Sequence, residues 1–283
     1  MAYKLDPQKM YRMPTHFGPS LGPRQGRNGQ QYTNVDSPKK TVVSVSFLSE
    51  HEQLEALLPE GFGVNGEPVV TISASYVREI EWLAGRGYNM LGVSFPATFR
   101  GQQDRAKGRF LAVLWENLAD PIITGREELG FSKIYCELPE YQVVEDEYRC
   151  SASWLGFQFL EMRVTNVAQL GTDEIAAHLT RSSYGASRTE NLLHYKYMPR
   201  TGAWGEADAC YATISPAPSP GATINAMWRG VGTVNFRRAT WEELPTLFHI
   251  VNTLEELVIK EYRGATIVKT VGGGDFRDQS ILR

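Results

Sequence analysis

Lys133 is the residue of this chain whose type and neighbours first suggest chemistry. It follows the triplet Gly-Arg-Glu (residues 125–127) by six residues and stands in the sequence Gly-Phe-Ser-Lys-Ile (130–134). A strand predicted at residues 110–115 leads through Asn117 and Pro121 into this segment. A lysine amine can bond covalently to a carbonyl substrate. Composition alone, however, predicts a solvent-exposed lysine in a turn, because lysine is seldom buried.

Other residue types that often carry chemistry lack the spacing that they would need. None of the five histidines belongs to a His-Glu-x-x-His pair, and no Gly-x-Ser-x-Gly, P-loop or dinucleotide fingerprint occurs. The three cysteines never form a Cys-x-x-Cys pair, so we expect neither a disulfide framework nor a zinc site. The Gly-rich stretch 272–275 has no helix after it and is predicted to be a flexible tail instead of a phosphate loop. We therefore expect no metal and no cofactor.

Residues 107–133 read Lys-Gly-x-Phe-Leu, then an Asn and a Pro, then Gly-Arg-Glu and the lysine. This pattern resembles the acetoacetate decarboxylase family. The similarity continues through residues 48–62, which contain Leu-Pro-Glu at 58–60, and through residues 228–271, so that it covers roughly 40 to 270. The resemblance implies a cone-shaped antiparallel β-barrel, a homo-oligomer, and Lys133 as an interior lysine that forms a Schiff base with the substrate.

The chemistry of that family explains why a lysine is needed. Loss of CO2 from a β-keto acid leaves a carbanion, and an iminium formed by the lysine amine accepts its electrons as an enamine. Only the neutral amine attacks the ketone, and a lysine with an ordinary pKa of about 10.4 is neutral in roughly 0.04% of molecules at pH 7. Desolvation in an apolar pocket raises this fraction, and acetoacetate decarboxylase is a known example of an activated lysine.

The resemblance also shows where this chain departs from the family. The family decarboxylase carries a second lysine after the nucleophile; this chain has Ile134, so burial beside Phe131 would have to favour the neutral amine. Two family glutamates and an arginine line the pocket, and these fall on Met90, Ser73 and Lys40 in this sequence. Both family carboxylates are therefore missing. The candidate substrate-binding residues are Lys40, Ser73, Tyr88, Met90 and Phe131.

Three functions remain open at this point. A pocket with methionine and serine in place of glutamates suits a β-keto acid larger than acetoacetate, decarboxylated through a Schiff base at Lys133. It equally suits an aldolase or dehydratase that uses the same lysine. A β-barrel that binds a small molecule without chemistry is the third function, which the retained Gly-Arg-Glu context disfavours. Glu79 and Glu81 could replace the missing carboxylates, although a solvated strand face is the simpler interpretation, and we expect Arg126 and Glu127 to pair with each other.

Strand-like segments dominate the elements that must position these residues. The predicted strands are 41–47, 68–76, 110–115, 160–167, 209–214, 222–228 and 232–237. Ser49 and Glu52 predict a capped short helix, and Thr240 and Glu243 predict the start of a long helix over 241–262. This pattern favours a mainly β (α+β) fold, a β-barrel or curved sheet with a few peripheral helices. We expect an irregular N-terminal arm at 1–40, one domain over 41–271 and a C-terminal tail at 272–283.

Composition limits the partners of this domain. The 283 residues carry 29 basic and 32 acidic side chains, a net charge of -3, so no basic field would hold nucleic acid or anionic lipid. No apolar run is long enough for a membrane helix, and residues 1–32 lack the apolar stretch of a secretory signal. We therefore expect a cytoplasmic protein whose partner is a small-molecule keto acid or ketone, with no nucleic acid and no membrane.

Overall fold

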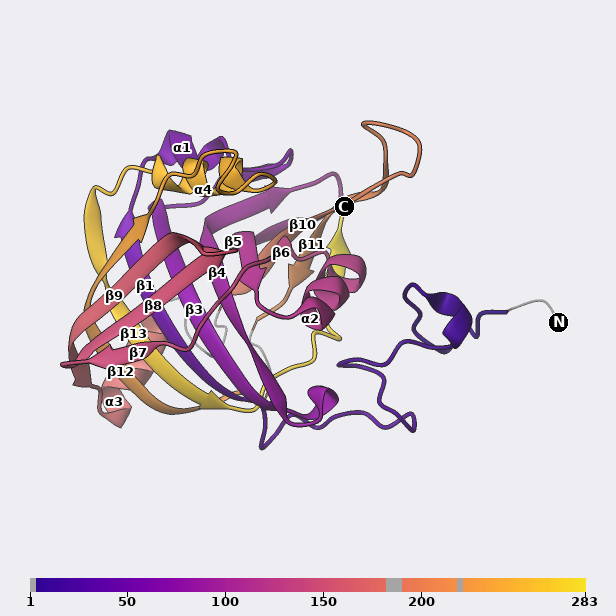
Figure 1. The fold of residues 1–283 in the computed structure, drawn as a ribbon, viewed down its shortest axis with the longest axis horizontal. Helices are drawn as coiled ribbons and strands as arrows, with labels where there is room; N and C mark the ends of the chain where they lie inside the picture. Colours follow the sequence, from indigo (N-terminus) through magenta and orange to yellow (C-terminus); the bar gives the residue numbers. More distant parts are fainter. Residues whose placement is uncertain (1–3, 182–189, 218–220) are drawn as a thin grey trace.

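One large curved sheet dominates the structure, a computed structural model that describes residues 4–181, 190–217 and 221–283 (Figure 1). Its strands are β1 (Lys39–Leu48), β2 (Phe62–Val64), β3 (Val69–Ile80), β4 (Arg86–Arg100), β5 (Arg105–Glu116), β6 (Lys133–Tyr135), β7 (Gln142–Val144), β8 (Glu147–Trp154), β9 (Phe157–Gln169), β10 (Asn191–Pro199), β11 (Ala207–Ser215), β12 (Thr223–Phe236), β13 (Glu261–Val271) and β14 (Ser280–Leu282). The helices are α1 (His51–Glu55), α2 (Ala119–Thr124), α3 (Thr172–Arg181) and α4 (Phe248–Glu255). Single turns are η1 (Thr15–Phe17), η2 (Glu81–Leu83) and the π-helical η3 (Gly125–Leu129).

The sheet confirms the mainly β class with a few peripheral helices. Its strand order is β14-β11-β10-β5-β4-β3-β1-β13-β12-β9-β8-β7, and β2 and β6 pair with β4 and β5 beside this path. The sheet is mixed, and the expectation of a purely antiparallel sheet was wrong, because β5 runs parallel to both β10 and β6. The described strands form an open path from β14 to β7, so a closed cone-shaped barrel is not confirmed.

The central strands β1, β3, β4 and β5 have two different faces because successive side chains alternate. One face packs large apolar side chains into the main core with β8 and β9, among them Val43, Val45, Ile72, Leu91, Trp115 and Phe159. The opposite face carries smaller and more polar side chains in cross-strand rows. These rows are Lys40–Val77–Tyr88, Val42–Ser75–Met90–Glu116 and Ser44–Ser73–Gly92–Leu114–Lys133. The candidate site residues therefore share the face that looks away from the main core.

All seven predicted strands lie within or largely within observed strands, with 222–228 and 232–237 joined in the single β12. The predicted helix over 241–262 was wrong in extent. Pro245 has no backbone N–H and interrupts it, so that α4 begins only at Phe248 and β13 already begins at Glu261. Thr240 and Glu243 do exchange both capping hydrogen bonds, at 3.0 and 3.3 Å, but at an isolated turn. Ser49 does not cap α1, whose N-cap residue is Glu50.

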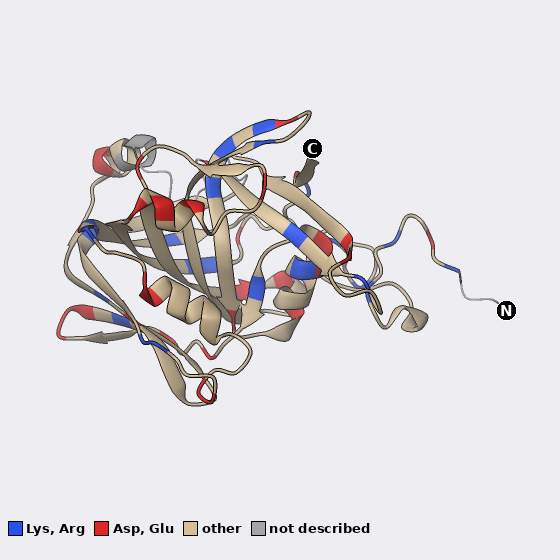
Figure 2. Ribbon diagram, turned by 90° about the horizontal axis from the view of Figure 1, so that it is seen from above, with Lys and Arg blue, Asp and Glu red and all other residues tan. Residues whose placement is uncertain are grey.

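The N-terminal arm extends past the edge of the sheet (Figure 1), and its Arg12 donates a hydrogen bond to Thr124 Oγ1 of α2 at 2.6 Å. Arg12 and Arg24 of the arm both form ion pairs with Glu128 of η3. The end of the arm also contacts the segment that follows β13. The backbone N–H groups of Gly272 and Gly273 donate hydrogen bonds to the carbonyl oxygens of Pro38 and Asn34. Residues 280–282, in the segment expected to be a tail, form β14 and pair with β11. Basic and acidic positions are interspersed along the described ribbon (Figure 2).

Candidate active site

Lys133 is buried at the start of β6, and 8% of its surface is exposed. Its Nζ lies 2.8 Å from Oε1 of Glu116 and donates to the carbonyl oxygen of Pro121 at 2.9 Å. The ring centroid of Phe131 is 5.4 Å from the same nitrogen. The expected burial of this lysine beside Phe131 is confirmed, and the surface lysine that composition predicts is not found.

The segment between α2 and β6 fixes the position of this amine. Gly125 has no Cβ, and one built there would meet Cδ and Cε of Lys133 at 2.4 Å and Nζ at 2.7 Å. Arg126 donates to the carbonyl oxygen of Lys133 at 2.7 Å, instead of forming the expected pair with Glu127. Gly130 ends η3 in the left-handed conformation, with φ of 80°, which favours glycine. Gly125 and Arg126 of the Gly-Arg-Glu block therefore shape the space around Lys133.

Glu116, the last residue of β5, is the functional candidate that the sequence analysis missed. Its side chain is fully buried, and its carboxylate is the acidic partner of Lys133. Burial raises the pKa of the Glu116 carboxyl above its ordinary value, and the nearby Lys133 partly opposes this shift. A carboxylate is therefore present beside Lys133 although Met90 and Ser73 occupy the two family glutamate positions. The sequence did contain a signal for Glu116. It is a charged residue at the end of an otherwise apolar strand, and it lies two residues after Leu114, so both side chains point to the same face, the one that carries the cavity.

A cavity of about 300 Å³ opens beside Lys133 on the polar face of the sheet. All six candidate site residues line it, namely Lys40, Ser73, Tyr88, Met90, Phe131 and Lys133. The arm and the Gly-rich stretch 272–276 also contribute to its wall, through Pro23, Arg24, Asn34 and Phe276. The stretch expected to be a flexible tail is thus part of the cavity wall.

The polar groups of this cavity include several cations. Lys40, Arg24 and the buried Arg109 line it together with Lys133. Hydroxyl and carbonyl oxygens hold the Arg109 guanidinium, which donates to Ser94 Oγ at 3.2 Å and to Thr71 Oγ1 at 3.0 Å. Glu190 and Asp275 also line the cavity, so among its described residues four cationic side chains stand beside two acidic ones, a balance that favours an anionic substrate.

The individual candidates take distinct places. Ser73 shares a hydrogen bond of 2.9 Å with Ser44, and Met90 lies between the rows of Tyr88 and Ser73. Burial and the carboxylate of Glu116 raise the pKa of Tyr88 well above its ordinary value. Phe131 packs against His194 with ring centroids 4.0 Å apart.

Three expected neighbours lie elsewhere. Ile134 alternates with Lys133 along β6 and lines a different cavity. Glu79 forms an exposed ion pair with Lys39 at 2.7 Å, and Glu81 lies in η2 after the register shift of β3. Both glutamates are exposed and neither lines the Lys133 cavity, so the simpler interpretation of solvated side chains is confirmed.

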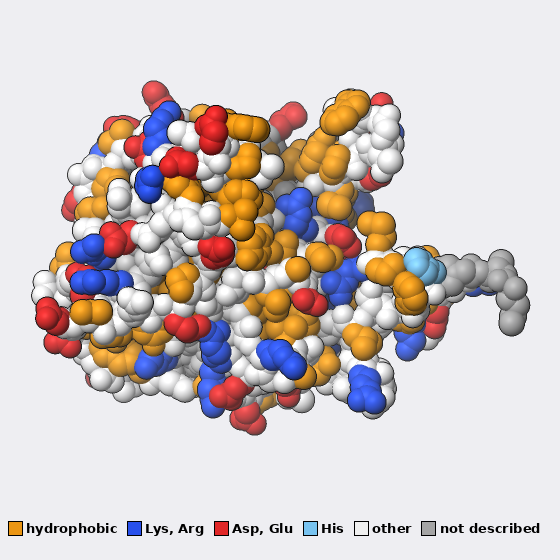
Figure 3. Space-filling model, viewed as in Figure 1, with side chains coloured by type: hydrophobic (Ala, Val, Ile, Leu, Met, Phe, Trp, Pro, Cys, Tyr) orange, Lys and Arg blue, Asp and Glu red, His pale blue; other side chains and the backbone are white. Residues whose placement is uncertain are grey.

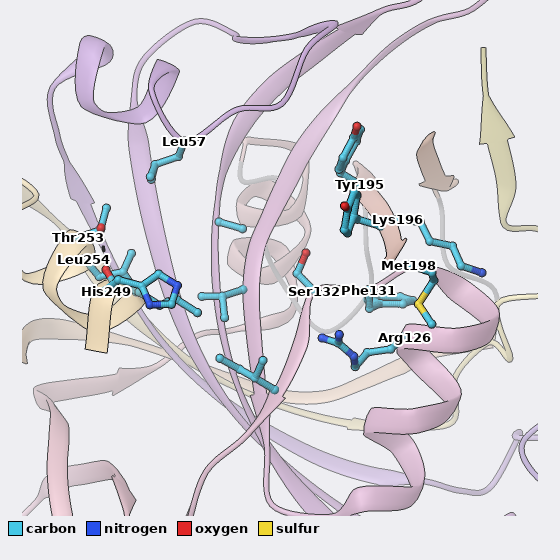
Figure 4. A pocket seen from close by; sticks show the side chains of 16 residues that line it. Leu57, Arg126, Phe131, Ser132, Tyr195, Lys196, Met198, His249, Thr253 and Leu254 are labelled. Atoms are coloured by element: carbon cyan, nitrogen blue, oxygen red, sulfur yellow. Dashed lines mark hydrogen bonds between the residues drawn. The ribbon is translucent and has the colours of Figure 1, made fainter. Parts of the chain in front are cut away.

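The second cavity, of about 480 Å³, lies on the other side of the 130–134 segment. Figure 4 shows Arg126, Phe131 and Ser132 on one side of it and His249, Thr253 and Leu254 of α4 on the other. Apolar side chains gather on this face between α4 and the β10–β11 hairpin (Figure 3). It is the larger cavity, but Lys133 does not line it.

Comparisons with known proteins agree with this arrangement. The sequence profile described as acetoacetate decarboxylase (ADC) matches residues 12–274, so the chain belongs to the acetoacetate decarboxylase family. No curated protein matches the chain significantly.

Among the described residues, no cluster of three or more His, Cys, Asp or Glu is placed to hold a metal ion. None of the described helices is long and apolar enough to cross a membrane.

Solved structures share the fold at low sequence identity. An acetoacetate decarboxylase from Legionella pneumophila has a TM-score of 0.64 and 16% identity, covering 92% of this chain and 94% of that chain. An acetoacetate decarboxylase-like enzyme from Sphingomonas wittichii RW1 has a TM-score of 0.61 and 15% identity, covering 88% and 94%. The enduracididine biosynthesis enzyme MppR, complexed with the condensation product of pyruvate and imidazole 4-carboxaldehyde, has a TM-score of 0.61 and 14% identity, covering 87% and 90%.

Proposed function

We propose that this protein decarboxylates a β-keto acid larger than acetoacetate through a Schiff base at Lys133. The observation that carries the proposal is a buried amine that lines a cavity and is held against Gly125, at the family's nucleophile position. The amine is removed from water, and desolvation is one of the ways in which a catalytic lysine is activated.

The residues divide the reaction between binding and bond breaking. Lys40 and Arg109 attract the carboxylate of the substrate into the cavity. The neutral amine of Lys133 adds to the ketone carbon, and loss of water gives an iminium. The bond to the carboxylate then breaks, CO2 leaves, and its electrons move into the iminium to give an enamine. A proton from water returns to carbon, and hydrolysis releases the ketone and the amine.

The cavity supports a substrate beyond acetoacetate. Its volume of about 300 Å³ is at the lower end of the range for drug-sized ligands, about 300 to 1,000 Å³. Apolar side chains form much of its wall, including Val42, Ile80, Trp82, Met90 and Leu111. An alkyl or aryl chain on the keto acid would remove these surfaces from water, at about 25 cal/mol per Å².

A Schiff-base aldolase or dehydratase is the second candidate, and the buried Glu116 carboxylate favours it. Aldol condensation and dehydration move protons at carbon and oxygen, and a carboxyl group beside the lysine can accept and return them. The complex of MppR with a condensation product shows that a protein of similar fold binds such a molecule. In a binding protein without chemistry, the third candidate, Lys133 would form no covalent adduct.

Borohydride trapping tests the proposal. The protein is incubated with 3-oxooctanoate or with its decarboxylation product heptan-2-one, reduced, and analysed by intact mass and peptide mapping. We expect one adduct on the peptide that contains Lys133, together with CO2 release from 3-oxooctanoate. Lys133→Arg keeps a cation beside Glu116 but forms no Schiff base, so both signals should vanish.

Lys196 provides the matched control, because it is partly buried, lines the other cavity and donates to the carbonyl oxygen of Glu127. Lys196→Arg should keep both the adduct and the CO2 release. Adducts on other lysines alone would refute the role of Lys133. An adduct without CO2 from several β-keto acids, together with condensation of pyruvate and an aldehyde, would select the aldolase.

A further inference from the structure

Among the described residues, the carboxylate that contacts the Lys133 amine comes from a strand where the family resemblance does not place it. Met90 of β4 stands where that resemblance puts a glutamate, and Glu116 of β5 is the direct cross-strand partner of Met90. Directly opposed residues of an antiparallel pair have Cβ atoms about 4.5 to 5.5 Å apart and point to the same face. A carboxylate on either residue therefore lies on the face of the sheet that carries Lys133, and of the two residues Met90 lines the cavity itself.

We propose that Glu116 is a catalytic residue that gives a proton to the departing oxygen when Lys133 forms its iminium and takes it back on hydrolysis. On this view, β5 supplies a carboxyl group that this chain lacks at position 90 of β4. The inference rests on the proposed Schiff-base function and adds to it an acid–base partner and its place on the sheet.

The contacts around the pair fit this role. The Glu116 carboxylate is fully buried and lies 2.8 Å from Nζ of Lys133, a reacting atom of the proposed function. Tyr88 faces it from β4, the carbonyl oxygen of Pro121 accepts from the amine on the α2 side, and Arg126 donates to the backbone oxygen of Lys133. One ammonium and one carboxylate thus form the centre of the site, and a single proton transfer between them gives a neutral amine and a neutral acid.

The neutral pair contains the nucleophilic form of the amine. Burial penalises the charged Glu116 carboxylate, and the attraction of the nearby ammonium opposes this penalty only partly, so the pKa of the carboxyl is raised. The raised pKa of the Glu116 carboxyl has the direction that this transfer requires.

The proton count closes over the cycle. A neutral amine, a ketone and the Glu116 acid become an iminium, a water molecule and the Glu116 carboxylate. One amine proton stays on the iminium, while the other leaves with the ketone oxygen and the acid proton as water. The carboxylate then pairs with the iminium cation as it paired with the Lys133 ammonium. After CO2 leaves, water protonates the enamine carbon, and the hydroxide that remains combines with CO2 as bicarbonate. Hydrolysis of the iminium then reverses the first step and returns the proton to Glu116.

Glu116→Gln tests the proposal, because the amide keeps the shape of the side chain but cannot release a proton. We expect the rate of borohydride-trappable adduct formation with heptan-2-one to fall about 100-fold or more, the lower end of general acid–base effects. We also expect the pH profile of that rate to lose the ionisation of the carboxyl group. A purely structural role would lower folding stability or raise KM and leave the pH profile unchanged, and that result would overturn the proposal.

A double variant that moves the carboxyl group from β5 to β4 tests whether positions 116 and 90 are equivalent. Glu116→Met alone removes the acid, and Glu116→Met combined with Met90→Glu returns it from β4. We expect the double variant to recover at least about 10-fold in adduct formation over the single variant, a part of the acid–base effect. Failure to recover in a folded double variant would overturn the cross-strand equivalence.

The outcome for the wild type keeps the two proposals apart. If the wild-type protein forms no adduct at Lys133, the Schiff-base function itself fails. If the wild type forms the adduct and Glu116→Gln forms it with the same rate and pH profile, only the role of Glu116 fails. Circular dichroism of each variant shows whether a loss of rate comes from a loss of fold.

Discussion

Replacing Gly125 with alanine should separate activity from stability. A Cβ at this position would lie 2.4 Å from Cδ and Cε of Lys133, whereas carbon atoms in contact prefer about 3.5 to 4.0 Å. The lysine chain must therefore move by about 1 Å, the difference between the two separations. Displacement of a reacting group by that distance costs about 100-fold in rate, which corresponds to about 2.7 kcal/mol in the activation barrier.

The backbone at Gly125 would accept the alanine. Its φ of -66° and ψ of -40° are helical, and alanine in a helix is more stable than glycine by roughly 0.5 to 1 kcal/mol. The contact with Lys133 opposes this gain, so we expect the unfolding free energy to change by less than about 1 kcal/mol in either direction. The assay is the rate of adduct formation with heptan-2-one beside a denaturant unfolding curve.

Two controls isolate the contact. Gly171→Ala adds a methyl group where the nearest atom is Glu174 Oε2 at 3.6 Å, and should leave both measurements unchanged. Gly125→Ala in a Lys133→Ala background should be stabilising, because the atoms that it would meet are gone. Wild-type adduct formation in Gly125→Ala would refute the idea that this glycine sets the position of the amine.

The remaining predictions concern charge. Lys40→Ala should lower kcat/KM for 3-oxooctanoate by roughly 5- to 150-fold, or about 1 to 3 kcal/mol. The rate of adduct formation with the neutral heptan-2-one should stay nearly unchanged. Equal losses with the anionic and the neutral compound would show that Lys40 does not bind the anion. In a Lys133→Met background, the Glu116 carboxyl has a raised pKa and holds its proton to higher pH in the folded than in the unfolded state. Stability should therefore fall as pH rises above the ordinary carboxyl pKa, by up to about 1.4 kcal/mol per pH unit, and Glu116→Gln in that background should abolish the fall; equal slopes in denaturant unfolding would contradict this. Glu128→Gln removes the charge that pairs with Arg12 and Arg24 and should weaken the binding of the arm by about 1 to 3 kcal/mol. Limited proteolysis should then cut residues 4–38 faster by roughly 5- to 150-fold. An unchanged cleavage rate would show that other contacts hold the arm.

The sequence by itself determined the strands and the lysine. Alternating β-branched residues predict β1 and β3 because the pleat turns every second side chain to the same face. The Gly-Arg-Glu block pointed to Lys133 through its resemblance to a family, and the fold later gave it a physical reason in the close approach of the lysine to Gly125. Local signals failed where one residue overrode them, as Pro245 did when it shortened the predicted helix.

Only the tertiary structure decided which side chains meet. Glu116 precedes Lys133 by seventeen residues, and no local pattern states that the chain folds back through α2 to place β6 beside β5. Sheet register then puts Glu116 opposite Met90, and a shift of one residue would turn its carboxyl into the apolar core. The arm and residues 272–276 close the cavity through contacts between chain ends that sequence spacing does not encode. The residue types were thus present in the sequence, but strand register and the path of the chain assembled them into a site.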